Sequence, residues 1–305
     1  MLVIQAALWS TTTNLQQQEQ QENGRQTNRR LAAAETKCSI ERARIHEYAA
    51  RMYQPPDDFA FLPGVPTSYV LERLATADGH EVSSGKLASP ESSAALAVNT
   101  FGWFHERPDR LPPFSVLGET ISRVTLVEIE YCARFPWSGG KHPWLDAWAE
   151  TPEVMIGIES KRFEPFRGPK KAELSRAYDR PVWHNRMTPY ETMRDKLRSG
   201  VERFELLDAV QLVKHAFGLV TEGRRKRKRP YLVYLFAEPT EYAGRPIDDS
   251  SRRRHRDEIA RFATAVTGAE VGFAAISYRE WLHSWPKSDS ELAAHRAAIL
   301  KHFNP

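Results

Sequence analysis

Cysteine is scarce in this sequence, and its scarcity limits the chemistry that the chain can perform. Cys38 and Cys132 are the only two cysteines among 305 residues, and no CxxC pair occurs. A disulfide framework and a zinc site built from several thiolates are therefore excluded. Any metal chemistry has to use oxygen and nitrogen ligands.

Long apolar runs are missing as well. No stretch of about 18 apolar residues occurs, so we expect no transmembrane helix and no membrane partner. Residues 1–9 are apolar, but no charged region precedes them and no clear cleavage signal follows. These absences favour a cytoplasmic location.

Three common catalytic motifs are also absent. The chain has no GxxxxGK[ST] phosphate loop, no GxSxG elbow and no HExxH pair. These absences argue against an ATPase, an α/β-hydrolase and a zinc hydrolase. The hydrophobic fraction of 41% and the charged fraction of 27% are typical of a globular protein, so the chemistry has to be sought in less familiar residue patterns.

Positive charge is concentrated in one part of the chain. Residues 195–256 contain 15 Lys and Arg against 9 Asp and Glu, although the net charge of the whole chain is only +4. Six like charges in a row repel one another, so we expect a mobile loop that meets nucleic acid. A solvated surface loop or an import-like signal is the alternative. The six residues are Arg224, Arg225, Lys226, Arg227, Lys228 and Arg229.

A second segment, residues 162–190, mixes basic and aromatic residues. Such mixing suits a surface that stacks bases and contacts phosphates. The same composition suits a long loop that packs its aromatic side chains on the core. The sequence leaves both interpretations open.

The composition changes along the chain and indicates two parts. Residues 11–30 are rich in Gln and poor in aliphatic side chains, which favours disorder, whereas residues 31–53 predict a helix. The Pro-, Gly- and Ser-rich stretch that follows places a boundary near Gly85. We expect an N-terminal extension over residues 1–85, partly disordered with one helix, and a single domain over residues 86–305.

Hydrophobic periodicity in residues 86–305 predicts an α/β layer fold. Runs of β-branched and apolar residues predict strands, and apolar residues at helical spacing predict helices. The predicted order is a helix at 90–101, strands at 121–132 and 153–161, a helix at 203–221, a strand at 231–237, a helix at 251–267, a strand at 270–277 and a helix at 290–303.

Acidic residues interrupt two of the apolar strands, where isolated charge is costly unless something opposite is bound. In the strand at 153–161, Glu159 and Lys161 share one face because side chains alternate along a strand. Asp146 lies 13 positions upstream within WLDAW, a segment short enough to be the preceding hairpin strand. One turn would place Asp146 beside Glu159.

This arrangement suits metal-assisted hydrolysis of phosphodiester bonds. Carboxylate oxygens are the ligands that Mg²⁺ prefers, and the metal charge makes a bound water more nucleophilic. Lys161 would orient that water or offset charge that develops on the phosphate.

The spacing D-x12-E-x-K resembles the motif of the PD-(D/E)XK nuclease superfamily. The segments SSAALAVNTF, LVEIEY, GIESKRFEPF and AVQLVKHAF resemble restriction-endonuclease-like bacterial proteins of that superfamily over about residues 89–282. The resemblance implies an αβββαβ core with a mixed central sheet flanked by helices. It also implies a Mg²⁺-dependent endonuclease that acts on DNA, with Mn²⁺ as a substitute metal.

The resemblance assigns roles residue by residue. Asp146 and Glu159 become metal ligands, the backbone carbonyl of Ser160 a further ligand, and Lys161 the catalytic lysine. Glu130 becomes an additional acid at the metal.

Two features depart from the family pattern. Leu145 replaces the usual proline before the aspartate, which weakens the assignment of Asp146. Some members carry a Gln and a Tyr four residues apart on the following helix. Here Gln211 is present, for which we expect a supporting role, but His215 occupies the second position.

The triplet D/E-x-K alone carries little information, since it also occurs at Glu35-Thr36-Lys37, in a region without a β-strand pattern. An exposed ion pair on an edge strand is therefore the simple alternative for Glu159 and Lys161.

The interpretation that fits these observations best is a metal-dependent DNA endonuclease. Cleavage of both strands of a duplex would suggest a homodimer. The competing interpretation, which the residues leave open, is a nuclease-like fold that binds nucleic acid or a protein without cutting.

Overall fold

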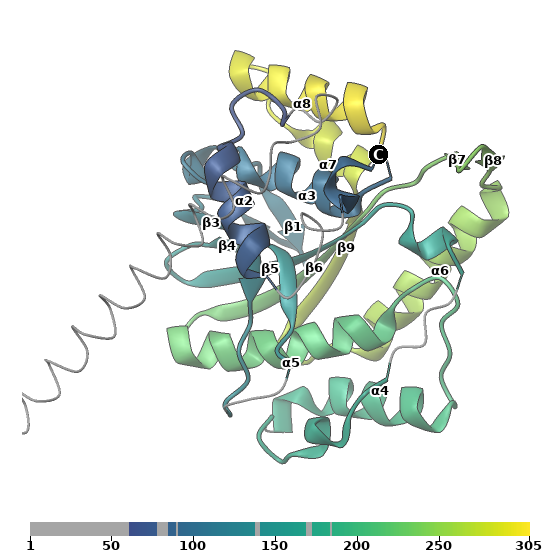
Figure 1. Ribbon diagram of the computed structural model, residues 1–305. Coiled ribbons are helices and arrows are strands. Elements are labelled where there is room, and N and C mark those ends of the chain that lie inside the picture. The colour runs from purple at the N-terminus through teal and green to yellow at the C-terminus, as the bar shows by residue number, and fades with distance from the viewer. Residues whose placement is uncertain (1–60, 78–84, 90, 138–140, 169–172, 184) are drawn as a thin grey trace, which may run out of the picture. The chain divides into compact units, whose positions relative to one another are not determined.

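A computed structural model describes most of the chain beyond residue 60 (Figure 1). Residues Pro55–Pro305 cluster as one compact unit. The helix expected at 31–53 and the triplet at 35–37 lie outside the described residues. The described ranges are 61–77, 85–89, 91–137, 141–168, 173–183 and 185–305.

A five-stranded mixed sheet forms the centre of this unit, in the order β3-β4-β5-β6-β9. The first three strands pair antiparallel, whereas β6 is parallel to β5 and β9 is parallel to β6. The strand bounds are β3 Leu126–Cys132, β4 Trp144–Glu150, β5 Val154–Lys161, β6 Arg229–Phe236 and β9 Gly272–Ser277.

The two central parallel strands are apolar because both of their faces are covered. Every residue of β5 except Lys161 is buried, and every residue of β6 except Arg229 is buried. Strands covered on both faces have near-continuous apolar sequences, which explains the runs VMIGI and YLVYLF. The charged side chains of Glu159 and Lys161 therefore stand at the end of an otherwise apolar strand.

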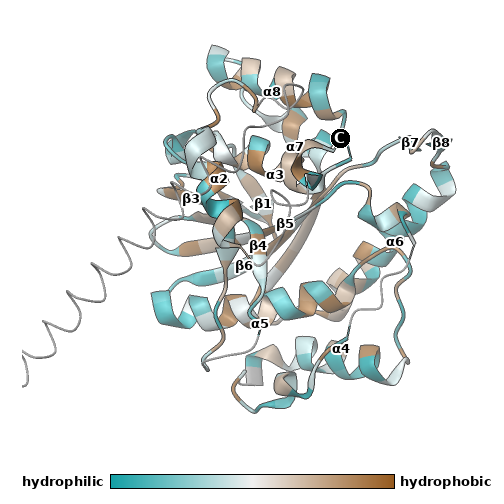
Figure 2. Ribbon diagram, viewed as in Figure 1, coloured by the Kyte–Doolittle hydropathy of each residue, from teal (hydrophilic) through white to brown (hydrophobic). Residues whose placement is uncertain are grey.

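Helices cover both faces of the sheet (Figure 1). Helices α3, α7 and α8 lie on one side, and α4, α5 and α6 lie on the other. Helix α5 carries both hydrophilic and hydrophobic turns, as expected for a helix with one face on the core (Figure 2). The helix bounds are α2 Thr67–Thr76, α3 Ser93–Gly102, α4 Thr188–Ser199, α5 Ala209–Lys226, α6 Asp249–Ala265, α7 Tyr278–Ser284 and α8 Ser290–Phe303.

Four short strands lie outside the central sheet. Strands β1 and β2 pair with each other, and so do β7 and β8. Their bounds are β1 Phe114–Val116, β2 Glu119–Ile121, β7 Glu241–Tyr242 and β8 Arg245–Pro246.

The predicted fold class is confirmed. The order α3, β3, β4, β5, α5, β6 reproduces the αβββαβ core, and β9 extends the sheet at the edge beyond β6. No helix in the described part of the chain combines the length and the apolar character needed to cross a membrane.

The predicted boundary near Gly85 does not separate the first described residues from the sheet. Helix α2 packs against β3, and its residues Val70 and Leu74 are buried. The Arg73 side chain donates hydrogen bonds to the carbonyls of Ile129 and Glu130. Residues 61–77 therefore form part of the same structural unit, because their apolar side chains are buried on it.

Two predicted elements begin later than expected. The helix predicted over 203–221 begins at Ala209, because the Asp208 side chain accepts a hydrogen bond from the Gln211 amide and caps the helix. The strand predicted over 121–132 is interrupted between β2 and β3, where Arg123 has a φ of 58°. The residues before Ala209 instead line a pocket.

The basic run is not the loop that like-charge repulsion predicts. Residues Arg224–Lys226 form the last turn of α5, Arg227 caps it in the left-handed conformation, and Arg229 begins β6. Acidic partners from other segments neutralise most of these charges, so the expected repulsion does not arise.

Candidate active site

Three acidic residues occupy equivalent positions on three neighbouring strands. The register pairs Ile129 with Ala147 and Ala147 with Ile158. One position further along, β3 carries Glu130, β4 carries Asp146 and β5 carries Glu159. The hairpin of β4 and β5 thus places Asp146 next to Glu159, as the sequence predicts.

The backbone is irregular at this row of acids. Glu130 has a φ of 47°, and the regular pairing of β3 and β4 skips the Glu130–Asp146 position. Leu145 and Trp148 both belong to the hydrophobic core cluster that contains the buried side chains of α5. On a regular strand, residues three apart would lie on opposite faces of the sheet. A strained backbone held by its surroundings is common at functional sites. Strict alternation along β3 therefore does not give the direction of the Glu130 side chain.

Glu159 is buried, and both of its carboxylate oxygens have a basic neighbour. Oε1 accepts a hydrogen bond from Lys161, and Oε2 lies 2.8 Å from Nε2 of His215 on α5. Burial by itself would raise the pKa of Glu159, but the charge of Lys161 and the imidazole of His215 outweigh it and lower the pKa to about 2. Glu159 is therefore ionised at neutral pH.

Asp146 has the opposite electrostatic environment. Its Oδ2 accepts a hydrogen bond from the backbone amide of Ser160 at 2.6 Å. Burial of the carboxyl raises the pKa of Asp146 well above its usual range, the nearby carboxylates of Glu159 and Glu130 raise it further, and Lys161 only partly offsets them. Negative charge at this position is therefore incompletely compensated by the protein.

Lys161 is the basic residue of the cluster, and only 14% of its side chain is exposed. Burial alone would lower its pKa, but Glu159, Asp146 and Glu164 together raise it. Lys161 therefore keeps its proton. Glu164, whose charge also acts on Lys161, accepts hydrogen bonds from the backbone amide of Arg162 and the hydroxyl of Ser93.

Ser160 lies between the two charged residues of β5, but its side chain points elsewhere. Its hydroxyl is 2.7 Å from the hydroxyl of Tyr278 on α7, across the sheet from the His215 contact of Glu159. The predicted role of Ser160 concerns only its backbone carbonyl, and the serine side chain serves to anchor the strand to α7.

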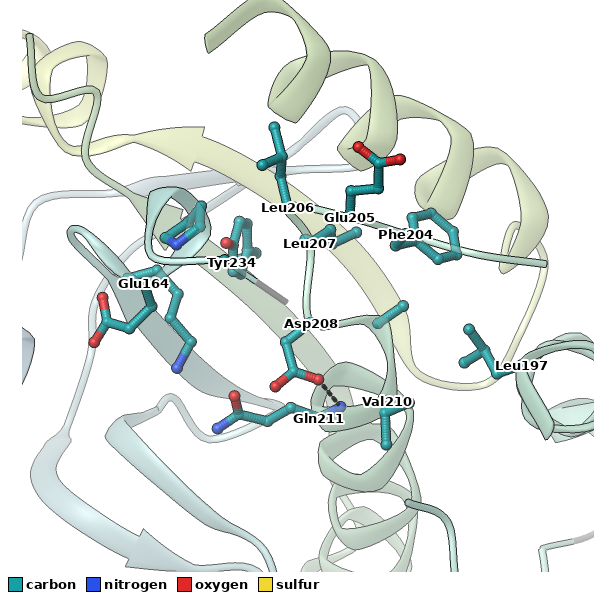
Figure 3. Close-up of a pocket in the computed structure, with 14 residues that line it drawn as sticks. Glu164, Leu197, Phe204, Glu205, Leu206, Leu207, Asp208, Val210, Gln211 and Tyr234 are labelled. Carbon is teal, nitrogen blue, oxygen red and sulfur yellow. Dashed lines mark hydrogen bonds between the residues drawn. The ribbon is translucent and has the colours of Figure 1, made fainter. Parts of the chain in front are cut away.

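A pocket with a cavity volume of about 110 Å³ opens beside Lys161. The labelled side chains of Glu164, Asp208, Gln211 and Tyr234 surround a common space in Figure 3. Gln211, predicted to support the site, lies in the first turn of α5. The remaining wall is mostly apolar and comes from residues 204–207, Leu197, Val210 and Pro165.

His215 is the site residue that the sequence did not assign. It lies one helical turn after Gln211, its side chain is 3% exposed, and it contacts Glu159. The signal in the sequence was its position four residues after Gln211, where some members of the resembled superfamily carry a tyrosine. The sequence could not show that the fold places this position of α5 against β5.

The basic run lies at the opposite end of β5 and β6 from Glu159. Arg229 pairs in register with Val154, five residues before Glu159, which corresponds to about 16 Å at about 3.3 Å per residue. Most of its members form ion pairs, with acids of other segments except in the pair Arg225–Glu222, whose two residues both lie on α5. The pairs are Arg224–Glu270, Arg225–Glu222, Lys226–Glu150, Lys228–Glu150 and Arg229–Glu119.

Several aromatic side chains of the segment 162–190 are part of the core. Tyr178, Trp183 and Tyr190 are buried, and all three belong to the cluster around α5. For these three residues the structure favours packing on the core over stacking with bases.

The acids at the site suit a hydrated metal ion rather than a closed protein cage. Within the described ranges, no three His, Cys, Asp or Glu side chains are arranged so that they could hold a metal by themselves. Mg²⁺ usually binds one or two carboxylates and keeps several waters. Asp146 and Glu159, with a negative charge that Lys161 compensates only in part, fit that requirement.

Comparison with known proteins identifies a family for this chain. No curated protein and no solved structure matches this chain. A family model described as "Restriction Endonuclease associating with ARP" matches residues 21–297, which is most of the chain. This match agrees with the mixed sheet flanked by helices and with the resemblance of the D-x12-E-x-K segment. The chain belongs to this restriction-endonuclease-like family.

Proposed function

We propose that this protein is a Mg²⁺-dependent endonuclease that hydrolyses phosphodiester bonds in DNA. The observation that carries the proposal is the cluster of Asp146 and Glu159 on adjacent strands with Lys161 next to Glu159. The family description, which names a restriction endonuclease, supports the same conclusion. It also names an association with ARP, and we propose that this chain has such a partner too.

In the proposed site, Asp146, Glu159 and the carbonyl of Ser160 hold the metal, and Glu130 adds negative charge near Asp146. The bound metal would polarise the phosphate and favour an ionised water as the nucleophile. Mn²⁺ would substitute, because it also accepts carboxylate and water oxygens.

Lys161 would act on the substrate rather than on the metal. Because its pKa is raised, its ammonium persists at neutral pH and can donate to the attacking water or to a phosphate oxygen. In the absence of substrate, Glu159 accepts its hydrogen bond. This contact keeps Lys161 beside the carboxylates.

We propose that DNA is also contacted by exposed cations of the basic run. Arg225 and Arg229 have side chains that are 62% and 55% exposed, and Arg227 is exposed as well. If these three residues contact phosphates, replacing them with serine should flatten the dependence of log K on log salt. An unchanged slope would remove the run from the binding surface.

A catalytically silent binding module is the competing function. One experiment separates the two: the full chain is incubated with plasmid DNA and Mg²⁺, with Mn²⁺, and with EDTA. The proposal expects cleavage with either metal and none with EDTA. Binding of DNA without cleavage under both metals would favour the silent module.

A further inference from the structure

We infer that the pocket beside Lys161 receives one nucleobase that carries an exocyclic amino group, next to the phosphate that is cut. This inference rests on the proposed nuclease function and names the part of the substrate that the site reads.

The charge of the pocket indicates what kind of group it accepts. The carboxylates of Glu164 and Asp208 line it against the single ammonium of Lys161, whereas the third acid of the lining, Glu205, has a 69% exposed side chain that pairs with Arg254. A phosphate placed among these carboxylates would be repelled, whereas a neutral group with hydrogen-bond donors would be favoured. The phosphate backbone therefore belongs at Lys161, and a neutral part of the nucleotide belongs in the pocket.

The size and wall of the pocket suit a single flat ring. The cavity has a volume of about 110 Å³, several times the roughly 10–15 Å³ that admits a single water. Opposite the polar side chains, the wall contains Phe204, Leu206 and Leu207. A ring bound here would contact apolar and aromatic side chains on one side and hydrogen-bonding groups on the other, which is how unstacked bases are held.

Two side chains have hydrogen-bonding capacity left for such a ring. Asp208 uses Oδ1 to cap α5, and no donor within the described ranges bonds to its Oδ2. The carboxamide of Gln211 likewise has no hydrogen-bond partner among the described residues, and Figure 3 shows both side chains at the pocket. A carboxylate accepts from the amino group of a base, and a carboxamide both donates and accepts.

The loop that forms the pocket wall is held in place from behind. The carboxylate of Glu258 on α6 is buried and accepts three hydrogen bonds, from the backbone amides of Glu205, Leu206 and Leu207, at 2.9–3.0 Å. The hydroxyl of Tyr234 is 3.0 Å from Nε2 of His255 on the same helix. Binding surfaces that are fixed in advance lose less entropy when they bind a ligand.

This assignment has consequences for the substrate. A base inside a continuous duplex is stacked, so the base that enters the pocket has to leave the stack or lie in a single-stranded segment. Thymine lacks an exocyclic amino group and should be disfavoured at that position relative to adenine, cytosine and guanine.

Fluorescence of 2-aminopurine tests the inference without cleavage. The Lys161→Ala variant is mixed with oligonucleotides that carry 2-aminopurine at successive positions, with Mg²⁺ present and binding followed by anisotropy. We expect the fluorescence to rise at a single position, where the base leaves the stack. Adding Asp208→Asn to this variant should abolish the rise. The inference is overturned if bound oligonucleotides show no rise at any position, or if Asp208→Asn leaves the rise unchanged.

Asp208→Asn is informative because asparagine caps a helix as well as aspartate does. The matched control is Asp248→Asn, the same change at the cap of α6, where the side chain accepts from the Ser251 amide outside the pocket. The control should behave like its parent.

Sequencing of the cut ends from a randomised DNA library gives a second readout. Thymine should be depleted severalfold at one position beside the cut, and Asp208→Asn should remove the depletion. Even base usage in the parent enzyme would contradict the inference while leaving the nuclease function established. Absence of cleavage with either metal would instead refute the nuclease function, and the 2-aminopurine signal would still decide on the pocket.

Discussion

Charge gathers at both ends of strands β5 and β6, and the two ends differ in balance. At the end near Val154, the basic residues meet acids that neutralise them, and Glu150 alone pairs with Lys226 and Lys228. At the end near Lys161, the carboxylates of Asp146 and Glu159 share one lysine. The difference teaches that a dense run of charge does not by itself mark a functional site, whereas buried charge without enough partners does.

The largest expected effect concerns the end near Lys161, where the carboxylates have too few basic partners. Asp146→Asn, Glu159→Gln and Lys161→Ala should each lower the rate of cleavage by about a thousandfold or more, because they remove metal ligands or charge stabilisation at the phosphate. Plasmid cleavage measures the loss. Lys37→Ala, in the second copy of the triplet, serves as control and should cut within a few-fold of the parent. Three site variants that cut as fast as the parent would refute the assignment.

At the end near Val154, where basic and acidic residues pair, substitutions should lower the stability of the protein instead of its cleavage rate. Replacing both Lys226 and Lys228 with methionine leaves Glu150, which is 6% exposed, without a cation. Removing the partner of a buried charge costs about 3 kcal/mol, which chemical denaturation measures as a lower free energy of unfolding. Adding Glu150→Gln to the double lysine variant should restore much of the lost free energy of unfolding. If the double lysine variant is as stable as the parent but binds DNA more weakly, these lysines belong to the DNA-binding surface instead.

Glu130 should have an intermediate effect. Its carboxylate is close enough to raise the pKa of Asp146, so it adds negative charge to the site. Glu130→Gln should lower the cleavage rate about tenfold and increase the Mg²⁺ concentration required, because the site then attracts cations less strongly. Rates measured over a Mg²⁺ series would show this. Parent-like activity at limiting Mg²⁺ would return Glu130 to a residue without a role at the metal.

The smallest expected effect is a gain in stability. Because the folded protein raises the pKa of Asp146, the ionised form destabilises the fold at neutral pH, and the penalty disappears as the pH falls and the carboxyl is protonated. Asp146→Asn should therefore raise the free energy of unfolding by about 1 kcal/mol at neutral pH and by less in acid. A loss of stability at neutral pH would show that Asp146 is well compensated and would weaken the contrast between the two ends.

Local patterns predicted the parts of the site that follow from local structure. The apolar run before Glu159 predicts β5, and a short hairpin then places Asp146 beside it. Most partners of the basic run were not predictable, because Glu119, Glu150 and Glu270 lie outside α5 and only the fold brings them to these basic residues. Glu222 is the exception, since it lies three residues before Arg225 on the same helix. A charge count along the sequence therefore overstated how free the basic residues are.

The same limit applies to His215 and to the pocket. The contact of His215 with Glu159 depends on how α5 lies across β5. The pocket wall depends on Glu258, which lies more than 50 residues away from the loop it holds. The left-handed φ of Glu130 breaks the alternation that a strand pattern assumes, so the pattern gave the strand correctly but not the direction of this side chain.

The central claim is that incompletely compensated carboxylates at the end of β5 attract a divalent cation. Calorimetric titration of the full chain with Mg²⁺ and Mn²⁺, in buffers of different ionisation enthalpy, tests it most directly. Because the pKa of Asp146 is raised, a cation should displace a proton from the site at mildly acidic pH, and Asp146→Asn should abolish the proton release. Absence of binding by either metal, or proton release that persists in Asp146→Asn, would contradict the account.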